Sequence, residues 1–275
     1  MRALWPLVGA FNFFMFNLTP TVRTLLFANI FFFAAQTYFL PLLTQIGSLY
    51  PIGSPMFFPW QFATSMFLHG SWMHLIFNMF GLISFGPLLE QRWGGQRFLV
   101  FWLICGIGAS MFYQGVRYYE VHKMEVARQE FRQDPSGANF VEFFRQNFPD
   151  QQGYEQVGAA MTRNPADAEY INSANTTLDA LVNRSYQVGM LGASGALFGL
   201  LFAFAYLFPN TELFLLFIPF PIKAKYFVFF YAAYELYAGV HRTPGDSVAH
   251  FAHLGGLLVG FILVKFWEGG RERFY

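Results

Sequence analysis

The sequence predicts an all-α polytopic membrane protein: a bundle of six transmembrane helices with a helical extramembrane insertion between the third and fourth. Three observations predict it. The chain of 275 residues is 55% hydrophobic and only 12% charged, whereas soluble domains carry about twice that share of charge. Apolar segments long enough to cross a bilayer recur along the chain. Ten acids and seven bases gather in the interval 117–184, which indicates a single polar insertion.

Composition also argues against several classes of partner and site. A net charge of +1 makes nucleic acid an improbable partner, because nucleic-acid-binding domains are strongly basic. The single cysteine, Cys105, permits neither an intramolecular disulfide nor a metal site built on cysteines. We expect no metal and no cofactor. The apolar segment 1–18 is too short to span and has no small-residue cleavage site, so we expect it to lie at the membrane interface.

The first half of the predicted bundle covers residues 19–118. Thr19-Pro20 marks the start of its first helix, because a threonine hydroxyl can cap a helix and proline suits the first position. The stretch 44–70 is aromatic but broken by three prolines. Irregular backbone cannot face lipid, so we expect this stretch to be an interfacial loop. The three spans of this half are predicted at about 25–43, 71–89 and 98–118.

The remainder of the chain divides into the insertion, the second half of the bundle and a tail. The insertion, 119–185, shows helical spacing of its aromatic residues and predicts two to four helices outside the membrane. Nothing in it resembles a catalytic pattern, so an accessory or docking role is expected. The second half of the bundle, 186–267, holds spans at about 192–208, 226–240 and 248–267, and 268–275 form a cytoplasmic tail.

The distribution of Lys and Arg in the short connecting segments predicts the orientation, because cytoplasmic loops are enriched in these residues. If the N-terminus is cytoplasmic, one basic residue lies outside, Arg242. The cytoplasmic side then holds Arg2, Arg23, Arg92, Arg97, Lys223, Lys225, Lys265, Arg271 and Arg273. We therefore expect both termini to lie in the cytoplasm and the start of the fourth span to face the outer side. We also expect the membrane to be a bacterial plasma membrane.

A serine between glycines stands at the start of the fourth predicted span. Ser194 lies between Gly192 and Gly195. The first turn of a helix offers N–H groups and a partial positive charge, which can hold a developing oxyanion. Small residues are also common where helices pack closely. On this stretch alone, helix packing is the better explanation.

Two further spans carry polar side chains that are costly inside a membrane and are usually functional there. His74 and Asn78 are four residues apart, so they share one face of the second span. His69 lies just before it. On the sixth span, a stripe on one face is formed by His250, His253, Gly256 and Gly260, and its glycines permit close approach of a partner helix.

Close packing of the fourth and sixth spans would bring His253 to Ser194, where an imidazole can take the hydroxyl proton. His74, Asn78 and the Ser194 N–H could then meet an oxyanion. No acid is spaced to complete a triad, since Asp246 lies at the interface and Glu235 is expected to reach the outer surface. The pattern therefore predicts a Ser–His dyad. A histidine metal site leaves the serine unexplained, and a proton-relaying transporter would need an inverted repeat that is not evident.

Five separated motifs now agree in order with one known family. They are Trp60-Gln61, then His69 with His74 and Asn78, Glu90-Gln-Arg92, Gly192-Ala-Ser194-Gly195, and Ala252-His253-Leu-Gly-Gly256. With these motifs the chain resembles the rhomboid intramembrane serine proteases over about residues 19–117 and 186–267. Agreement of several motifs is a far more specific signal than a lone Gly-x-Ser.

The resemblance implies a role for each matching residue. Ser194 would be the nucleophile and His253 the general base. His74, Asn78 and the Ser194 N–H would form the oxyanion hole, which Gly192 supports through its backbone. Phe198 stands where relatives often have a tyrosine that stacks on the base, and His250 stands where some have asparagine. Gly195, Gly256 and Gly260 would allow the helices to pack.

The resemblance also implies partners. Substrates would be single-span membrane proteins, cut within the bilayer near its outer face after a small residue. The competing expectation is a rhomboid-like pseudoprotease that binds membrane clients without cutting them.

Overall fold

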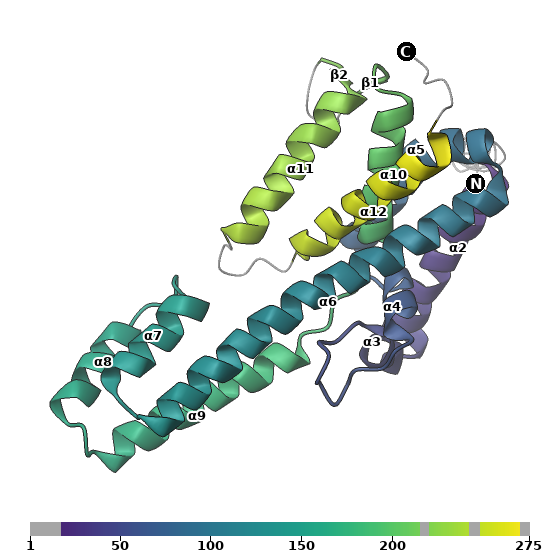
Figure 1. Ribbon diagram of the computed structural model, residues 1–275. Coiled ribbons are helices and arrows are strands. Elements are labelled where there is room, and N and C mark those ends of the chain that lie inside the picture. Colours follow the sequence, from purple (N-terminus) through teal and green to yellow (C-terminus); the bar gives the residue numbers. More distant parts are fainter. Residues whose placement is uncertain (1–17, 215–219, 242–247, 270–275) are drawn as a thin grey trace, which may run out of the picture.

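The structure is a computed structural model and describes residues 18–214, 220–241 and 248–269. All but one residue of the predicted interfacial segment, 1–18, lie outside these ranges. Asp246 and most of the predicted tail, 268–275, lie outside them too. Helices dominate the described chain, and Figure 1 shows them in two groups joined by one long helix, α6 (Gly95–Gln133).

The larger group is a helical bundle built around α10 (Ser194–Leu207), in which 11 of 14 residues are buried. Such a helix, apolar on every side, suits the centre of a bundle. Around it lie α5 (Trp72–Trp93), α6, α11 (Ala224–Val240) and α12 (His250–Glu268), and α2 (Pro20–Ala34) packs on α5.

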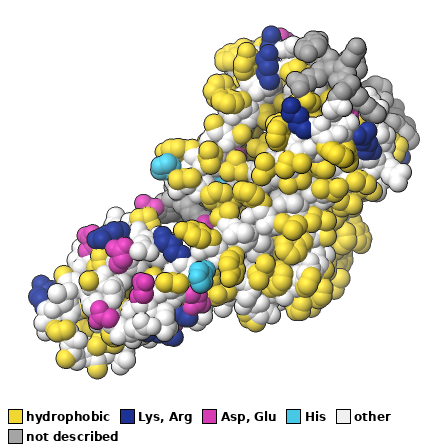
Figure 2. All heavy atoms as spheres, viewed as in Figure 1, with side chains coloured by type: hydrophobic (Ala, Val, Ile, Leu, Met, Phe, Trp, Pro, Cys, Tyr) yellow, Lys and Arg dark blue, Asp and Glu magenta, His cyan; other side chains and the backbone are white. Residues whose placement is uncertain are grey.

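Among the described helices, α5, α6 and α12 are long and apolar enough to cross a membrane, and α10 is apolar but shorter. The expected count of six spans therefore remains a prediction, whereas a helical membrane protein is supported. Figure 2 shows hydrophobic side chains spread over the bundle and charged ones gathered over the smaller group. Phe77, Phe229 and Phe266 are 65%, 66% and 83% exposed, as expected of side chains that face lipid.

Short elements make the connections. Between α2 and α5 lie the π-helix η1 (Ala35–Phe39), α3 (Leu42–Gly47), α4 (Gln61–Thr64) and the 3₁₀-helix η2 (Ser65–Phe67). The strands β1 (Glu212–Leu213) and β2 (Ile222–Lys223) pair antiparallel between α10 and α11. Buried Gln61 satisfies several backbone groups of the aromatic loop, accepting from Tyr50 N and donating to Met56 O.

The first helix is capped differently from expectation. The Thr19 side chain makes no capping hydrogen bond to α2. Instead the carboxylate of Glu90, from the end of α5, accepts hydrogen bonds from the N–H groups of Thr21 and Val22 at 2.8 Å each. A carboxylate at a helix N-terminus is favoured by the helix dipole, so part of the Glu90-Gln-Arg92 motif fastens α2 to α5.

The smaller group contains the polar insertion. The helix that contains the third predicted span does not stop near residue 118, because α6 continues as one helix of 39 residues to Gln133. Three helices follow: α7 (Gly137–Asn147), α8 (Tyr154–Arg163) and α9 (Ala168–Gln187). Together with the second half of α6 they enclose a separate core of Val121, Met124, Ala127, Phe131, Phe140, Phe143, Phe144, Met161, Ala174, Leu178 and Val182. Figure 1 shows α9 running beside α6 back toward the bundle.

Candidate active site

The polar residues singled out in the sequence lie at one end of the bundle. The helices α5, α10 and α12 all begin at this end, and α11 finishes there. His74 stands in the first turn of α5, Ser194 is the first residue of α10, and His253 is in the first turn of α12. The insertion leaves and rejoins the bundle at the same end, because α9 stops seven residues before Ser194.

The structure brings Ser194 and His253 into hydrogen-bonding contact. The Ser194 Oγ lies 2.8 Å from the His253 Nε2. The His253 side chain is almost fully buried, and the Phe198 ring stacks on its imidazole with the centroids 4.2 Å apart and the planes 9° from parallel. The stacked ring holds the imidazole in one plane, so Nε2 stays directed at the hydroxyl. An imidazole in this position can accept the hydroxyl proton.

Glycines permit this contact by allowing α10 and α12 to approach backbone to backbone. A Cβ atom added at Gly256 would lie 2.0 Å from the carbonyl oxygen of Gly195, and one at Gly260 would lie 2.7 Å from the Gly199 Cα. A Cβ at Gly195 itself would lie 2.6 Å from the Ala109 side chain of α6. The close packing predicted from this glycine stripe is present, and it sets the distance between Ser194 and His253.

His74 lies against the backbone that leads into Ser194. Gly192 has φ +132°, a conformation that side chains rarely adopt, and a Cβ there would be 2.7 Å from the His74 Nε2. Only glycine gives the imidazole this space. One turn along α5, buried Asn78 donates from Nδ2 to the His74 carbonyl oxygen at 2.9 Å. An amide has two N–H donors, so this bond leaves Asn78 a second one.

His69 precedes α5 and is fully buried. Its ring packs edge-on against His74, with centroids 5.1 Å apart. Within the described part of the chain, neither ring nitrogen makes a hydrogen bond of good geometry. The backbone of His69 is held by Gln36, whose amide donates to its carbonyl at 2.7 Å and accepts from its N–H at 3.2 Å. His69 therefore touches the site through His74 and not through Ser194.

The interfacial loop and the segment before Ser194 support each other. Leu49 and Met190 exchange two backbone hydrogen bonds, at 2.8 and 2.9 Å. Gly192 N–H donates to the Ser65 carbonyl at 2.9 Å. The turn that carries Ser194 is thus fixed by a part of the chain more than a hundred residues away, which sequence patterns did not reveal.

The expectation for Glu235 is wrong. This carboxylate does not reach the outer surface: it is 2% exposed, and its Oε2 lies 2.9 Å from the His253 Nδ1 and 2.7 Å from the His250 Nδ1. An acid therefore does stand behind the imidazole that contacts Ser194. The available signal was the presence of one carboxylate in an apolar helix, which marks a functional position by default.

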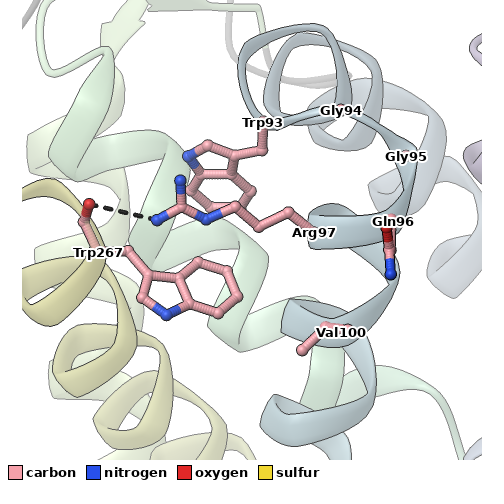
Figure 3. A pocket seen from close by; sticks show the side chains of 7 residues that line it. All are labelled: Trp93, Gly94, Gly95, Gln96, Arg97, Val100 and Trp267. Carbon is pink, nitrogen blue, oxygen red and sulfur yellow. Dashed lines mark hydrogen bonds between the residues drawn. The ribbon is translucent and has the colours of Figure 1, made fainter.

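A surface hollow of about 490 Å³ lies at the opposite end of the bundle. It is formed where α5 passes into α6, beside the end of α12, and Figure 3 shows Arg97 extended over the Trp267 ring. The guanidinium carbon is 4.5 Å from the ring centroid, and Arg97 also donates to the Trp267 carbonyl at 3.3 Å. The residues that line this hollow include neither a nucleophile nor a general base, so the hollow is not a candidate active site.

Comparison with known proteins matches the parts of the chain that contain the polar residues of the candidate active site. The profile of the rhomboid domain matches residues 58–122 and 171–267. An uncharacterised mitochondrial rhomboid protein of Schizosaccharomyces pombe is 29% identical over 216 residues, which are 76% of this chain and 52% of that protein. The rhomboid protease AarA of Providencia stuartii is 34% identical over 67 residues, 24% of each chain.

A third relative, the mitochondrial rhomboid protein 1 of Saccharomyces cerevisiae, is 43% identical over 87 residues, 30% of this chain and 25% of the relative. The chain spans about half the length of the fission yeast protein, and less of the other two. Two of the three names place the relative in mitochondria, so these relatives do not support the expected bacterial location over a mitochondrial one. The matched segments contain Ser194, His253, His74 and Asn78, and the chain belongs to the rhomboid family.

Proposed function

We propose that this protein is an intramembrane serine endopeptidase that cleaves single-span membrane proteins. The observation that carries the proposal is the 2.8 Å contact between Ser194 Oγ and His253 Nε2, at the start of a helix buried within an apolar bundle. In such surroundings, packing alone does not explain why a serine and a histidine are in contact. Together they form an activated nucleophile. The Providencia relative, which carries the word protease in its name, supports the same reaction.

In the proposed reaction, Ser194 Oγ attacks the carbonyl carbon of a substrate peptide bond while its proton passes to His253 Nε2. The carbonyl oxygen becomes an oxyanion beside the first turn of α10 and the side chains of His74 and Asn78. His253 then gives the proton to the leaving amine, and the C–N bond breaks. Water attacks the remaining ester by the same route in reverse and frees Ser194.

The proposed oxyanion hole is tested by His74→Ala and Asn78→Ala. Removing one donor of this kind costs about 10²–10³ in turnover, so each variant should cleave a transmembrane substrate that much more slowly. Both should still be labelled at Ser194 by a small, reactive phosphonate, because the nucleophile and base are intact. Cleavage assays and labelling of the purified, reconstituted protein measure the two quantities.

A matched control for Asn78→Ala is Asn29→Ala. Asn29 is a buried asparagine of α2 whose amide donates to the carbonyl four residues earlier, as Asn78 does, but it lies outside the cluster. Asn29→Ala should retain wild-type turnover. Equal losses in both variants would assign the effect of Asn78 to helix stability and refute its role as an oxyanion donor.

In the proposed topology both chain termini lie in the cytoplasm. The end of the bundle that holds Ser194 lies at the outer face, and the insertion lies outside the membrane. This topology follows from the Lys and Arg asymmetry of the short connections. Ser173 of α9 and Gln96 of α6 are both exposed, so a cysteine at either position can be reached by a reagent on its side of the membrane. In a Cys105→Ala background, an impermeant thiol reagent should label the Ser173→Cys variant in sealed cells and spare the Gln96→Cys variant. The reverse pattern would invert the topology.

The second candidate is a pseudoprotease that binds membrane clients without cutting them. The Ser194–His253 contact favours the enzyme, because a binding protein has no use for an activated hydroxyl. A wild-type protein that binds a transmembrane client but is neither labelled at Ser194 nor able to cleave would favour the pseudoprotease.

A further inference from the structure

Three buried ionisable side chains meet at the end of α11 and the start of α12. Glu235, His250 and His253 are 2%, 6% and 8% exposed. One oxygen of Glu235, Oε2, lies within hydrogen-bonding distance of the Nδ1 atoms of both histidines. A carboxylate buried in an apolar bundle is costly unless donors surround it, and the two imidazoles supply them.

The hydrogen bonds define which ring nitrogen of His253 carries the proton. An ionised carboxylate can only accept, so both Nδ1 atoms must donate to Glu235. In neutral His253 the other nitrogen, Nε2, then has a free lone pair. That lone pair faces the Ser194 hydroxyl at 2.8 Å. The chain of contacts thus prepares His253 to accept a proton at Nε2.

We propose that Glu235 is a positioning residue for His253, so that Ser194, His253 and Glu235 work as a triad. His250 holds the Glu235 carboxylate in place by donating a second hydrogen bond to it. The proposal rests on the proposed function. When the Ser194 proton passes to Nε2, His253 becomes an imidazolium, its Nδ1–H remains in place, and Glu235 stays ionised opposite the new positive charge. No proton reaches Glu235. In related triads, a carboxylate in this position fixes the tautomer and stabilises the imidazolium.

The test compares two substitutions of the same residue in the purified, reconstituted full chain. Glu235→Gln preserves the size of the side chain and loses the charge. Glu235→Asp retains the charge and shortens the side chain. If the charge positions and stabilises His253, Glu235→Gln should lower kcat by about 10⁴-fold, as loss of the charge of a triad carboxylate does, and change KM little. Glu235→Asp should retain more activity than Glu235→Gln. Phosphonate labelling of Ser194 should slow in the same order.

Glu268→Gln is the matched control. Glu268 is also a buried carboxylate on a bundle helix, 3% exposed, where it accepts from Trp93 Nε1 at 2.9 Å and pairs with Arg92 at 2.6 Å. It lies at the opposite end of α12 from His253. Glu268→Gln should lower the thermal unfolding temperature as much as Glu235→Gln or more, while kcat stays within about two-fold of wild type.

Three results would overturn the proposal. The first is Glu235→Gln with wild-type kcat. The second is Glu235→Asp being as slow as Glu235→Gln or slower, since a role in shape alone favours the isosteric amide. The third is wild-type activity that a chelator abolishes and zinc restores, which would make the three side chains metal ligands, whose donor atoms all lie within 4.8 Å of one another. A wild-type protein without any cleavage or labelling would instead refute the proposed function.

Discussion

Ser194→Ala and His253→Ala should each abolish cleavage of a single-span substrate with a destabilised transmembrane helix. The alanine variant at 194 has no hydroxyl to attack the peptide bond, and the variant at 253 has no base to take its proton. In the proposed mechanism the nucleophile and the base act as one unit, so the double variant should be no slower than either single one. Rates measured in proteoliposomes, with the fraction of folded protein determined by thermal unfolding, give the comparison.

Ser185→Ala is the control for the loss of a serine. Ser185 is a buried serine of α9 whose hydroxyl donates to the Val182 carbonyl, and its removal should leave the cleavage rate unchanged. Undiminished turnover in Ser194→Ala would remove the enzyme assignment altogether. A double variant much slower than both single variants would mean that Ser194 and His253 contribute separately.

Gly256→Ala should reduce activity by about 10²-fold or more even though it adds a single methyl group. That methyl would lie 2.0 Å from the Gly195 carbonyl oxygen, so α10 and α12 must separate. Ser194 and His253 stand on these two helices, and a displacement of about 1 Å in a catalytic geometry can cost about 10²-fold. The cleavage rate and the unfolding temperature should therefore fall together.

The control for Gly256→Ala is Gly115→Ala in α6. An added Cβ at Gly115 meets nothing within 4 Å, and alanine is favoured over glycine within a helix by about 0.5–1 kcal/mol. Gly115→Ala should be neutral in activity and neutral or slightly stabilising in the unfolding temperature. If Gly256→Ala also leaves the cleavage rate and the unfolding temperature unchanged, close packing of α10 and α12 is not needed to keep Ser194 and His253 in contact.

The contacts that can be predicted from the sequence are those whose reason is local. Ser194 is conspicuous because it starts an apolar helix between glycines, and His253 because it shares a helical stripe with Gly256. Such stripes follow from helical geometry alone, so the contact of these two helices could be predicted. Close packing at these glycines places Ser194 beside His253, so this contact can be predicted without any other information.

What the sequence does not reveal depends on which way a helix is turned in the folded bundle. Glu235 lies five residues from the end of α11, where a carboxylate could turn outward to water or inward to α12. Only packing decides this, and it places the carboxylate against two histidines. The cap of α2 is hidden for the same reason, because Glu90 is 69 residues from Thr21. The length of α6 is missed because charged residues mark where a membrane ends and do not mark where a helix ends.

The length of the continuous helix α6 sets how far the proposed extramembrane insertion extends from the bilayer. At about 1.5 Å per residue, the 39 residues of α6 extend about 58 Å, nearly twice the hydrocarbon thickness of about 30 Å. The part from Arg117 to Gln133 alone adds about 25 Å, and ion pairs from Arg128 and Arg132 to Asp179 clamp α9 along it. An extended polypeptide covers that distance with about eight residues. If substrates are cut beside Ser194 and the insertion lies outside the membrane, as proposed, a substrate would meet the far end of the insertion only if its extramembrane segment continued at least that many residues beyond the membrane surface.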